Sequence, residues 1–200
     1  MRLLAFSDVH RDSRQAARLA EMAADADVVL AAGDFGSQHR GVGDVIDMLV
    51  VVEKPTILIP GNSETDEELR EACAGWAAAN VLHGDGVEIG GVEFFGLGGG
   101  IPPTPWPWSF DLKEEEAAAK LEPCPEGGVL VVHSPPKGYL DRAFGRHLGS
   151  EAIRSAIEEK RPRLAVFGHI HNAAGEQAEL GPTRLVNAGP DGVFLKLDQS

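Results

Sequence analysis

Cysteine is scarce in this sequence, which holds only Cys73 and Cys124 among its 200 residues. Two cysteines so far apart are too few for a disulfide framework or a zinc ribbon. Long hydrophobic runs are also missing, because charge or glycine interrupts every apolar stretch, so no segment is expected to span a bilayer. The chain meets an acid at Asp8, too early for the apolar region of a signal peptide. We therefore expect a cytoplasmic protein.

Basic residues are few as well. The 18 lysines and arginines face 31 aspartates and glutamates, which gives a formal net charge of −13. This balance argues against a groove for duplex nucleic acid and against binding to anionic membrane surfaces. A chain of this length can bury roughly 70% of its unfolded surface, so it does not need a partner for stability, although a homo-oligomer is compatible with the sequence. We expect a single domain over residues 1–200.

Short apolar runs alternate with helical patterns along the first third of the chain. The expected strands are 3–6, 28–32 and 57–59, and the expected helices are 13–24, 42–52 and 65–79. Strands that alternate with helices in this way predict right-handed crossovers and a parallel sheet covered by helices.

The middle of the chain changes character. Gly90-Gly91 separates the apolar runs 87–89 and 92–95, which is a two-residue hairpin signal. The stretch from Gly96 to Pro107 is rich in glycine and proline, and its length is typical of a functional loop. Trp106 and Trp108 are expected either to stack on a base or aryl group or to cover the core beneath this loop.

The pattern of short strands and helices resumes in the second half. We expect helices at 111–121 and 150–160 and strands at 128–132, 163–167, 176–180, 183–187 and 193–197. The run Glu114-Glu115-Glu116 is expected to be a solvated helix face. These elements predict two sheets packed together with helices outside.

Ligands usually gather where parallel strands end. Five apolar runs are followed there only by Asp, His and Asn side chains, namely Asp8, His10, Asp34, Asn62, His133, His169 and His171. Each of these residues alone has an ordinary structural interpretation; Asp34 can cap the next segment, and Asn62 can sit in a turn. Their coincidence at five strand ends favours a site for divalent cations, which accept carboxylate, imidazole and amide oxygen together.

In this order, five blocks resemble the signature of calcineurin-like metallophosphoesterases. The blocks are Asp8-Val9-His10, Gly33-Asp34, Gly61-Asn62-Ser63-Glu64, His133 and Gly168-His169-Ile170-His171, and Asn187-Ala188-Gly189-Pro190 further resembles a small prokaryotic branch of predicted phosphoesterases. The resemblance implies a four-layer αββα sandwich, with two mixed sheets flanked by helices and a two-metal centre. It implies that one ion takes Asp8, His10 and His171. The other would take Asn62, His133 and His169, with Asp34 bridging both.

The activity that the resemblance implies is hydrolysis of a small phosphate ester, a phosphodiester in preference to a monoester. A hydroxide that bridges the metals would attack the phosphorus, and Asp34, Asn62 and His133 would belong to the catalytic centre. Two carboxylates and this hydroxide leave two divalent ions about one unit positive, which attracts phosphate to an acidic protein. Mn²⁺ is the expected metal, and Fe or Zn would accept the same ligands.

Position 63 departs from the family pattern. Ser63 stands where the family commonly has a histidine that contacts phosphate or protonates the leaving oxygen. Losing a general acid costs on the order of 10²–10⁴ in rate, and less when the leaving group is a weak base. We therefore expect activated or diester substrates, or another donor, for which His39 is the nearest candidate with Arg40 as a charge stabiliser. The alternatives are a solvated loop position for His39 and a helix-capping role for Ser63.

Two other functions compete with this interpretation. An inactive scaffold of the same fold would bind proteins, but such drift should erode the ligands, and all seven positions are filled. A nuclease of the same superfamily is disfavoured by the net charge and the lack of a basic stripe.

Overall fold

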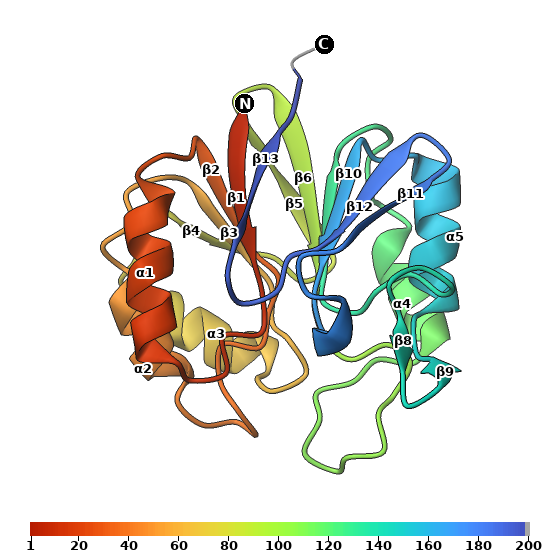
Figure 1. Cartoon of the computed structure of the whole chain (residues 1–200), viewed down its shortest axis with the longest axis horizontal. Helices are drawn as coiled ribbons and strands as arrows, with labels where there is room; N and C mark the ends of the chain where they lie inside the picture. Colours follow the sequence, from red (N-terminus) through yellow and green to blue (C-terminus); the bar gives the residue numbers. More distant parts are fainter. Residues whose placement is uncertain (199–200) are drawn as a thin grey trace.

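Parallel strands joined by helices build the first of two large sheets in the computed structural model, which describes residues 1–198. The strand order is β13-β1-β2-β3-β4, with β1 at Arg2–Phe6, β2 at Val28–Ala31, β3 at Thr56–Leu58, β4 at Ala79–Val81 and β13 at Val193–Lys196. Strands β1 to β4 run parallel, and β13 pairs antiparallel with β1. Helices α1 (Ser13–Ala23), α2 (Val42–Leu49) and α3 (Asp66–Cys73) cover the outer face (Figure 1).

The second sheet has six strands in the order β11-β12-β10-β7-β6-β5. Their bounds are β5 Asp85–Ile89, β6 Val92–Leu97, β7 Val129–Val132, β10 Leu164–Phe167, β11 Gln177–Leu180 and β12 Thr183–Asn187. The four inner strands are parallel, and the edge strands β5 and β11 are antiparallel to their neighbours. Helices α4 (Glu114–Leu121) and α5 (Glu151–Lys160) cover the outer face of this sheet.

Three apolar clusters separate the resulting four layers, one between the two sheets and one beneath each helical layer. Strand β1 shows how one short run serves two of them. Leu3 and Ala5 pack between the sheets, whereas Leu4 and Phe6 pack under the helices, because side chains alternate along a strand. Strands buried on both faces read as continuous apolar runs, as the sequence shows. The predicted αββα sandwich is therefore confirmed.

Several predicted helix bounds are wrong. The helix expected at 65–79 ends at Cys73, and residues 79–81 instead form the edge strand β4, which pairs with β3. The helix expected at 42–52 ends at Leu49. The helix expected at 111–121 begins only at Glu114. Asp111 belongs to the preceding loop, where its carboxylate accepts hydrogen bonds from Thr104 and Ser109.

Two small elements near the strand ends were not predicted. Strands β8 (Arg142–Ala143) and β9 (Arg146–His147) form a separate hairpin, and η1 (His171–Ala173) is a single 3₁₀ turn. Asp141 fixes the base of the hairpin, since its carboxylate accepts from His147 Nδ1 at 2.6 Å and from the Gly138 and Gly149 amides. In Figure 1 the hairpin lies at the same end of the molecule as the long loop between β6 and α4.

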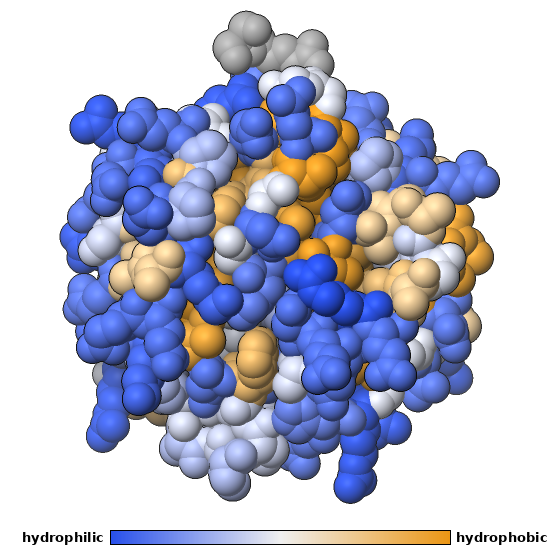
Figure 2. All heavy atoms as spheres, turned by 180° about the vertical axis from the view of Figure 1, so that it is seen from behind, coloured by the Kyte–Doolittle hydropathy of each residue, from blue (hydrophilic) through white to orange (hydrophobic). Residues whose placement is uncertain are grey.

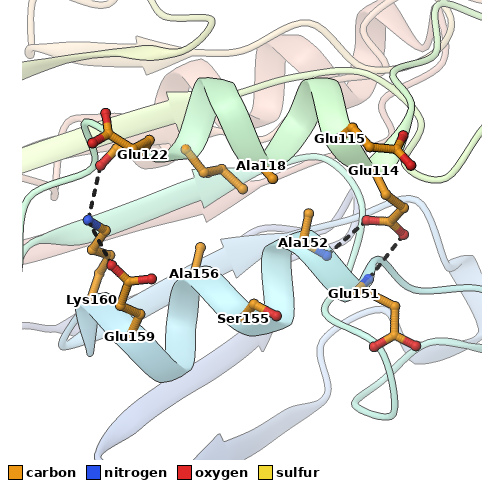
Figure 3. Close-up of a pocket in the computed structure, with 11 residues that line it drawn as sticks. Glu114, Glu115, Ala118, Glu122, Glu151, Ala152, Ser155, Ala156, Glu159 and Lys160 are labelled. Carbon is orange, nitrogen blue, oxygen red and sulfur yellow. Dashed lines mark hydrogen bonds and ion pairs between the residues drawn. The ribbon is translucent and has the colours of Figure 1, made fainter.

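Glu114 corrects another expectation, because it is not part of a solvated face. Its carboxylate lies against the beginning of α5 and accepts from the Glu151 amide at 3.0 Å and the Ala152 amide at 2.8 Å (Figure 3). It also accepts from Oγ of Ser150, the residue that precedes α5, at 2.7 Å. The two amides belong to the first turn of a helix, where amides lack partners within the helix. Residues of α4 and α5 line a groove between the two helices. At the end of this groove away from Glu114, Lys160 Nζ donates to the Glu122 carbonyl at 3.0 Å.

The outer surface is largely polar on the face that Figure 2 shows. Figure 2 shows a face that is mostly hydrophilic, with apolar side chains visible near its middle. Among the described residues, no helix is long and apolar enough to cross a membrane.

Candidate metal centre

The carboxyl ends of five strands meet at one end of the molecule, the lower end in Figure 1. Each of these strands leads directly to candidate ligands. Asp8 and His10 follow β1, Asp34 follows β2, Asn62 follows β3, His133 follows β7, and His169 and His171 follow β10. The first sheet thus contributes four of the seven predicted side chains and the second sheet contributes three. The structure brings all seven together.

Asp8, His10 and His171 form the first group. One ligand atom from each lies within 4.8 Å of the other two. His10 Nε2 and His171 Nε2 are 3.1 Å apart, and His171 Nε2 is 3.5 Å from Asp8 Oδ1. His10 Nδ1 donates to the Gly36 carbonyl, which leaves a lone pair on Nε2 of the neutral ring. Two imidazole nitrogens at this distance need a shared proton or a cation between them.

Asn62, His133 and His169 form the second group. Asn62 Oδ1 lies 3.0 Å from His169 Nδ1 and 3.2 Å from His133 Nε2, and the two nitrogens are 3.2 Å apart. His133 Nδ1 donates to the Ala32 carbonyl at 2.8 Å, so its Nε2 carries the lone pair when the ring is neutral. Cis ligands of an octahedral ion with bonds of about 2.1 Å lie about 3.0 Å apart, so these separations fit a small divalent cation.

A hydrogen-bond relay fixes the orientation of the Asn62 amide. Asn62 Nδ2 donates to Ser109 Oγ at 3.0 Å, and Ser109 Oγ donates to Asp111 Oδ1 at 2.7 Å. Since the carboxylate can only accept, the relay runs in one direction and turns Asn62 Oδ1 towards the two histidines. Ser109 and Asp111 were not predicted as site residues, because neither follows a strand.

Asp34 lies between the two groups. Its Oδ2 is 3.5 Å from His10 Nε2, and its Oδ1 is 3.4 Å from His133 Nε2. The Ser63 amide donates to Oδ1 at 2.9 Å and holds the carboxylate in this position. One oxygen therefore faces each group, which is the arrangement that a bridging ligand requires.

The protonation states respond to this crowding. Burial alone would raise the pKa of Asp8, but hydrogen bonds from His171 and Ser7 and the charge of His133 outweigh it and lower the pKa to about 2. The hydrogen bond to Asp8 raises the pKa of His171. Burial and the charge of His133 lower the pKa of His169 to about 4. Asp8 as an anion and His169 as a neutral ring are in the states that bind a metal, whereas a metal that binds His171 competes with the proton that Asp8 favours there.

Backbone conformation at the strand ends is unusual. Asp8, His10, Asp34 and His169 all adopt positive φ, at 57°, 45°, 59° and 65°. Such conformations are costly for residues other than glycine and cluster at functional sites. Four of the seven candidate ligands share this feature, which is typical of a functional site and not of residues that only support the fold.

Glu64 holds together the loops that carry Asp34 and Asn62, and it was not among the predicted site residues. Its fully buried carboxylate accepts from the Gly61, Asp34 and Gly36 amides at 2.7, 2.8 and 3.0 Å. Burial and the nearby charge of Asp34 raise the pKa of Glu64 to about 7, while the amide hydrogen bonds act in the opposite direction. The side chain ties the loop after β2 to the loop after β3, and therefore Asp34 to Asn62.

Similarity to known proteins identifies the family. The calcineurin-like phosphoesterase family model matches residues 1–173. The chain belongs to the calcineurin-like phosphoesterase family. Members of this family use divalent metal ions. The ligand atoms of Asp8, His10 and His171, and those of Asp8, Asp34 and His133, lie close enough together to hold one. Asn62 and His169 adjoin the second of these sets through His133.

Similar proteins are found in animals, and a bacterial protein shares the fold. The chain is 30% identical to a UPF0046 protein of Caenorhabditis elegans over 82% of its own length and 62% of that protein. It is 33% identical to human metallophosphoesterase domain-containing protein 1 over 66% of its length and 39% of that protein. The chain thus spans only part of these relatives. The crystal structure of TT1561 of Thermus thermophilus has the same fold, with a TM-score of 0.78, 18% identity and coverage of 95% and 90% of the two chains.

A cavity of about 360 Å³ opens over the candidate metal centre. Its polar part is lined by His10, Asp34, Asn62, Ser63, His169 and His171. The long loop contributes Trp106 and Trp108, so these side chains reach the cavity instead of only covering the core. Among the residues that the structure describes, no lysine or arginine lines the cavity.

His39 does not point into this cavity. Its Nδ1 lies 2.9 Å from Glu68 Oε2, and its Nε2 forms a short hydrogen bond with the Trp108 carbonyl. Both oxygens are acceptors, so both nitrogens donate, and the hydrogen bond with Glu68 raises the pKa of His39. Arg40 is exposed and also lies outside the cavity lining. In this arrangement His39 links α3 to the long loop, and its role as an acid stays a prediction that the geometry does not favour.

Proposed function

We propose that this chain is a dinuclear metal-dependent phosphoesterase that prefers phosphodiesters to monoesters. The observation that carries the proposal is the convergence of seven side chains from five strand ends into two groups with Asp34 between them. Asp8, His10 and His171 would hold one ion, and Asn62, His133 and His169 the other. Bound divalent ions supply Lewis-acid activation of water and neutralise charge on the phosphoryl oxygens.

The protein's own groups would orient and support this chemistry. Hydrogen bonds from His10 and His133 to backbone carbonyls fix the ring tautomers. The relay through Ser109 and Asp111 fixes the Asn62 oxygen. These contacts set the ligands before substrate arrives, which is the arrangement that lowers the cost of reorganisation during reaction.

The preference for diesters follows from charge and from position 63. A diester carries one negative charge at neutral pH and a monoester carries up to two. Because no lysine or arginine lines the cavity among the described residues, the metals would supply most of the charge that balances the phosphate. Ser63, buried at the cavity wall, supplies no imidazolium to protonate a leaving group. A diester with a weakly basic leaving group places the smaller demand on both counts.

Metal content and turnover of Asp34→Asn test the proposal. The purified chain should bind two Mn²⁺ and hydrolyse bis-p-nitrophenyl phosphate faster than p-nitrophenyl phosphate. Asp34→Asn should lose metal and at least about 100-fold in kcat/KM, beyond the loss typical of an outer-shell partner. Asp47→Asn, an exposed acid on α2, is the matched control and should behave as the wild type. Bound metal without turnover of either ester would instead support a protein-binding scaffold.

Ser63→His tests the account of the missing acid. The variant should accelerate hydrolysis of esters with strongly basic leaving groups by about 10-fold or more, and change activated esters little. Rates for a series of aryl phosphates with different leaving-group pKa check this. An unchanged slope of log rate against that pKa would contradict the account.

A further inference from the structure

The cavity over the centre has an aromatic rim that the proposed chemistry does not require. Trp106 and Trp108 come from the long loop between β6 and α4, and Phe144 comes from the β8–β9 hairpin. The rim therefore brings together two segments that are far apart in sequence. The cavity's volume of about 360 Å³ lies within the roughly 300–1,000 Å³ of pockets that hold small molecules.

The two tryptophans form a parallel pair. Their ring centroids lie 5.6 Å apart with an interplanar angle of 9°. Each indole has one face against its partner and another face directed away from it. Trp106 is nevertheless 45% exposed, which is a poor use of a large apolar side chain if covering the core were its only role.

Phe144 occupies a backbone position that disfavours a bulky side chain. It occupies the first position of the two-residue turn between β8 and β9, with φ of 51°, and Gly145 follows with φ of 73°. Turns with positive φ at both positions favour Asn-Gly or Gly-Gly, and bulky side chains are strained there. The Phe144 side chain is also 89% exposed at the cavity edge. Neither stability nor solubility explains a phenylalanine at this position.

Both sides of the rim are held in place by hydrogen bonds. The Trp108 carbonyl accepts from His39, and the Phe110 amide donates to the Asn62 carbonyl at 2.9 Å. Asp141 holds the base of the hairpin through its contacts with Gly138, His147 and Gly149. The backbone of both segments is thus fixed relative to the candidate ligands before any substrate binds.

We infer that the rim binds a flat aromatic ring in the substrate while the phosphate lies on the metal centre. This inference rests on the proposed function, and it names the substrate class as phosphate esters that carry a nucleobase or an aryl group. The composition of the cavity lining supports this inference. It includes the rings of two tryptophans and one phenylalanine and, among the described residues, no lysine or arginine. A second phosphate or a polyanion would find no counter-charge on the protein there, whereas a neutral ring would find stacking partners.

Matched substrate pairs test the inference with the full chain loaded with Mn²⁺. Adenosine 5′-(2,2,2-trifluoroethyl phosphate) and methyl riboside 5-(2,2,2-trifluoroethyl phosphate) share the same diester and the same activated, non-aromatic leaving group, and they differ in the base. 2,2,2-Trifluoroethyl 2-phenylethyl phosphate and 2,2,2-trifluoroethyl 2-cyclohexylethyl phosphate share that leaving group and differ in the aromaticity of the ring. The ring-bearing member should have a kcat/KM at least about fivefold higher, which is the lower end of measured stacking contributions.

Binding supplies a readout that does not depend on turnover. Trp76 is buried in the core, where its Nε1 donates to the Val52 carbonyl, so changes in tryptophan fluorescence report mainly on Trp106 and Trp108. Titration with the same four compounds should give dissociation constants at least about fivefold lower for the aromatic member of a pair.

Phe144→Asn separates a binding role from a structural one. The change creates the turn sequence that positive φ favours, so the midpoint of urea unfolding should stay or rise. The preference for the aromatic member should nevertheless fall at least about threefold, because one stacking face is lost. Trp108→Leu should lower it similarly. Phe194→Leu is the control, since Phe194 is 36% exposed on β13 and covered by the Arg2 guanidinium, away from the cavity.

The outcomes distinguish this inference from the proposed function. Turnover without aromatic preference in either pair overturns the inference and leaves the phosphoesterase intact. Aromatic preference in binding without turnover of any ester supports the inference and overturns the enzyme. A larger preference in the adenosine pair assigns the rim to nucleobases, and a larger one in the phenyl pair assigns it to aryl groups. A preference that survives Phe144→Asn and Trp108→Leu unchanged overturns the rim as its source.

Discussion

Glycine precedes three of the candidate ligands, and at Gly168 the reason is steric. A Cβ at this position would lie 2.3 Å from both Asp8 Oδ2 and Ser7 Oγ. We predict that Gly168→Ala displaces the Asp8 carboxylate and lowers Mn²⁺ affinity at least about 10-fold. Gly43→Ala is the control, because a Cβ there meets nothing within 4 Å and alanine favours the helix α2. Titration calorimetry of both variants checks this, and equal affinities would contradict the steric argument.

Asp141, which is not one of the candidate metal ligands, makes the unfolding free energy depend on pH. Burial alone would raise its pKa, but hydrogen bonds from the Gly138 amide and His147 outweigh burial, and the pKa of Asp141 is lowered below its ordinary 3.8. A group with a lowered folded-state pKa contributes stability above its unfolded pKa, and this contribution disappears as the pH falls through the folded pKa. Unfolding free energy should therefore decline more steeply below about pH 4 in the wild type than in Asp141→Asn. Urea titrations from pH 5 to pH 3 measure the difference, with the exposed Asp191→Asn as the control.

Residues of the centre were predictable where they follow an apolar run and not elsewhere. Asp8, Asn62 and His133 stand a short way after the ends of buried strands, so topology alone places them together. Glu64, Ser109 and Asp111 reach the same place by hydrogen bonding across loops, and no periodic pattern reports such contacts. For His39 the sequence indicated proximity to the centre, but only the partners of its nitrogens show which way the ring faces.

The contact between α4 and α5 includes the carboxylate of Glu114, which lies between the two helices. Glu114 begins α4 and accepts from the first-turn amides of α5 (Figure 3). Removing its charge should cost about 0.5–2 kcal/mol of unfolding free energy, the range for helix-capping groups. Glu114→Gln measured by urea unfolding checks the value. Its exposed neighbour Glu115→Gln should change stability little, and equal effects of the two changes would show that the cap contributes nothing specific.

Helices and strands could be predicted where their burial produces a regular pattern of apolar residues in the sequence. Strands such as β1, β2 and β10 are buried on both faces, and their apolar runs matched the observed bounds closely. Strand β4 has three residues of intermediate burial beside a helix, so its pattern merges with that of α3. The hairpin β8–β9 has two-residue strands held mainly through Asp141 and carries no periodicity at all.

At the scale of the whole molecule, the candidate metal centre lies where the two sheets meet. The loops after β1, β2 and β3 contribute Asp8, His10, Asp34 and Asn62, while the loops after β7 and β10 contribute the remaining histidines. Two buried carboxylates and four imidazoles face one another at this junction. Divalent ions bound to the folded state alone would stabilise it by about 2.7 kcal/mol at 100 times the dissociation constant.

Removal of metal should therefore lower the melting temperature by about 5–10 °C for a chain of this size, and added Mn²⁺ should restore it. The location of the effect is more informative than its size. Because the ions would link one sheet to the other, hydrogen exchange in the chelated protein should rise in the loops after β1, β2, β7 and β10 together. Amides of α1 and α5, which pack on the outer faces, should change much less. Faster exchange confined to one sheet would mean that the two sets of ligands do not share a metal centre, and the bridging position of Asp34 would then have no function.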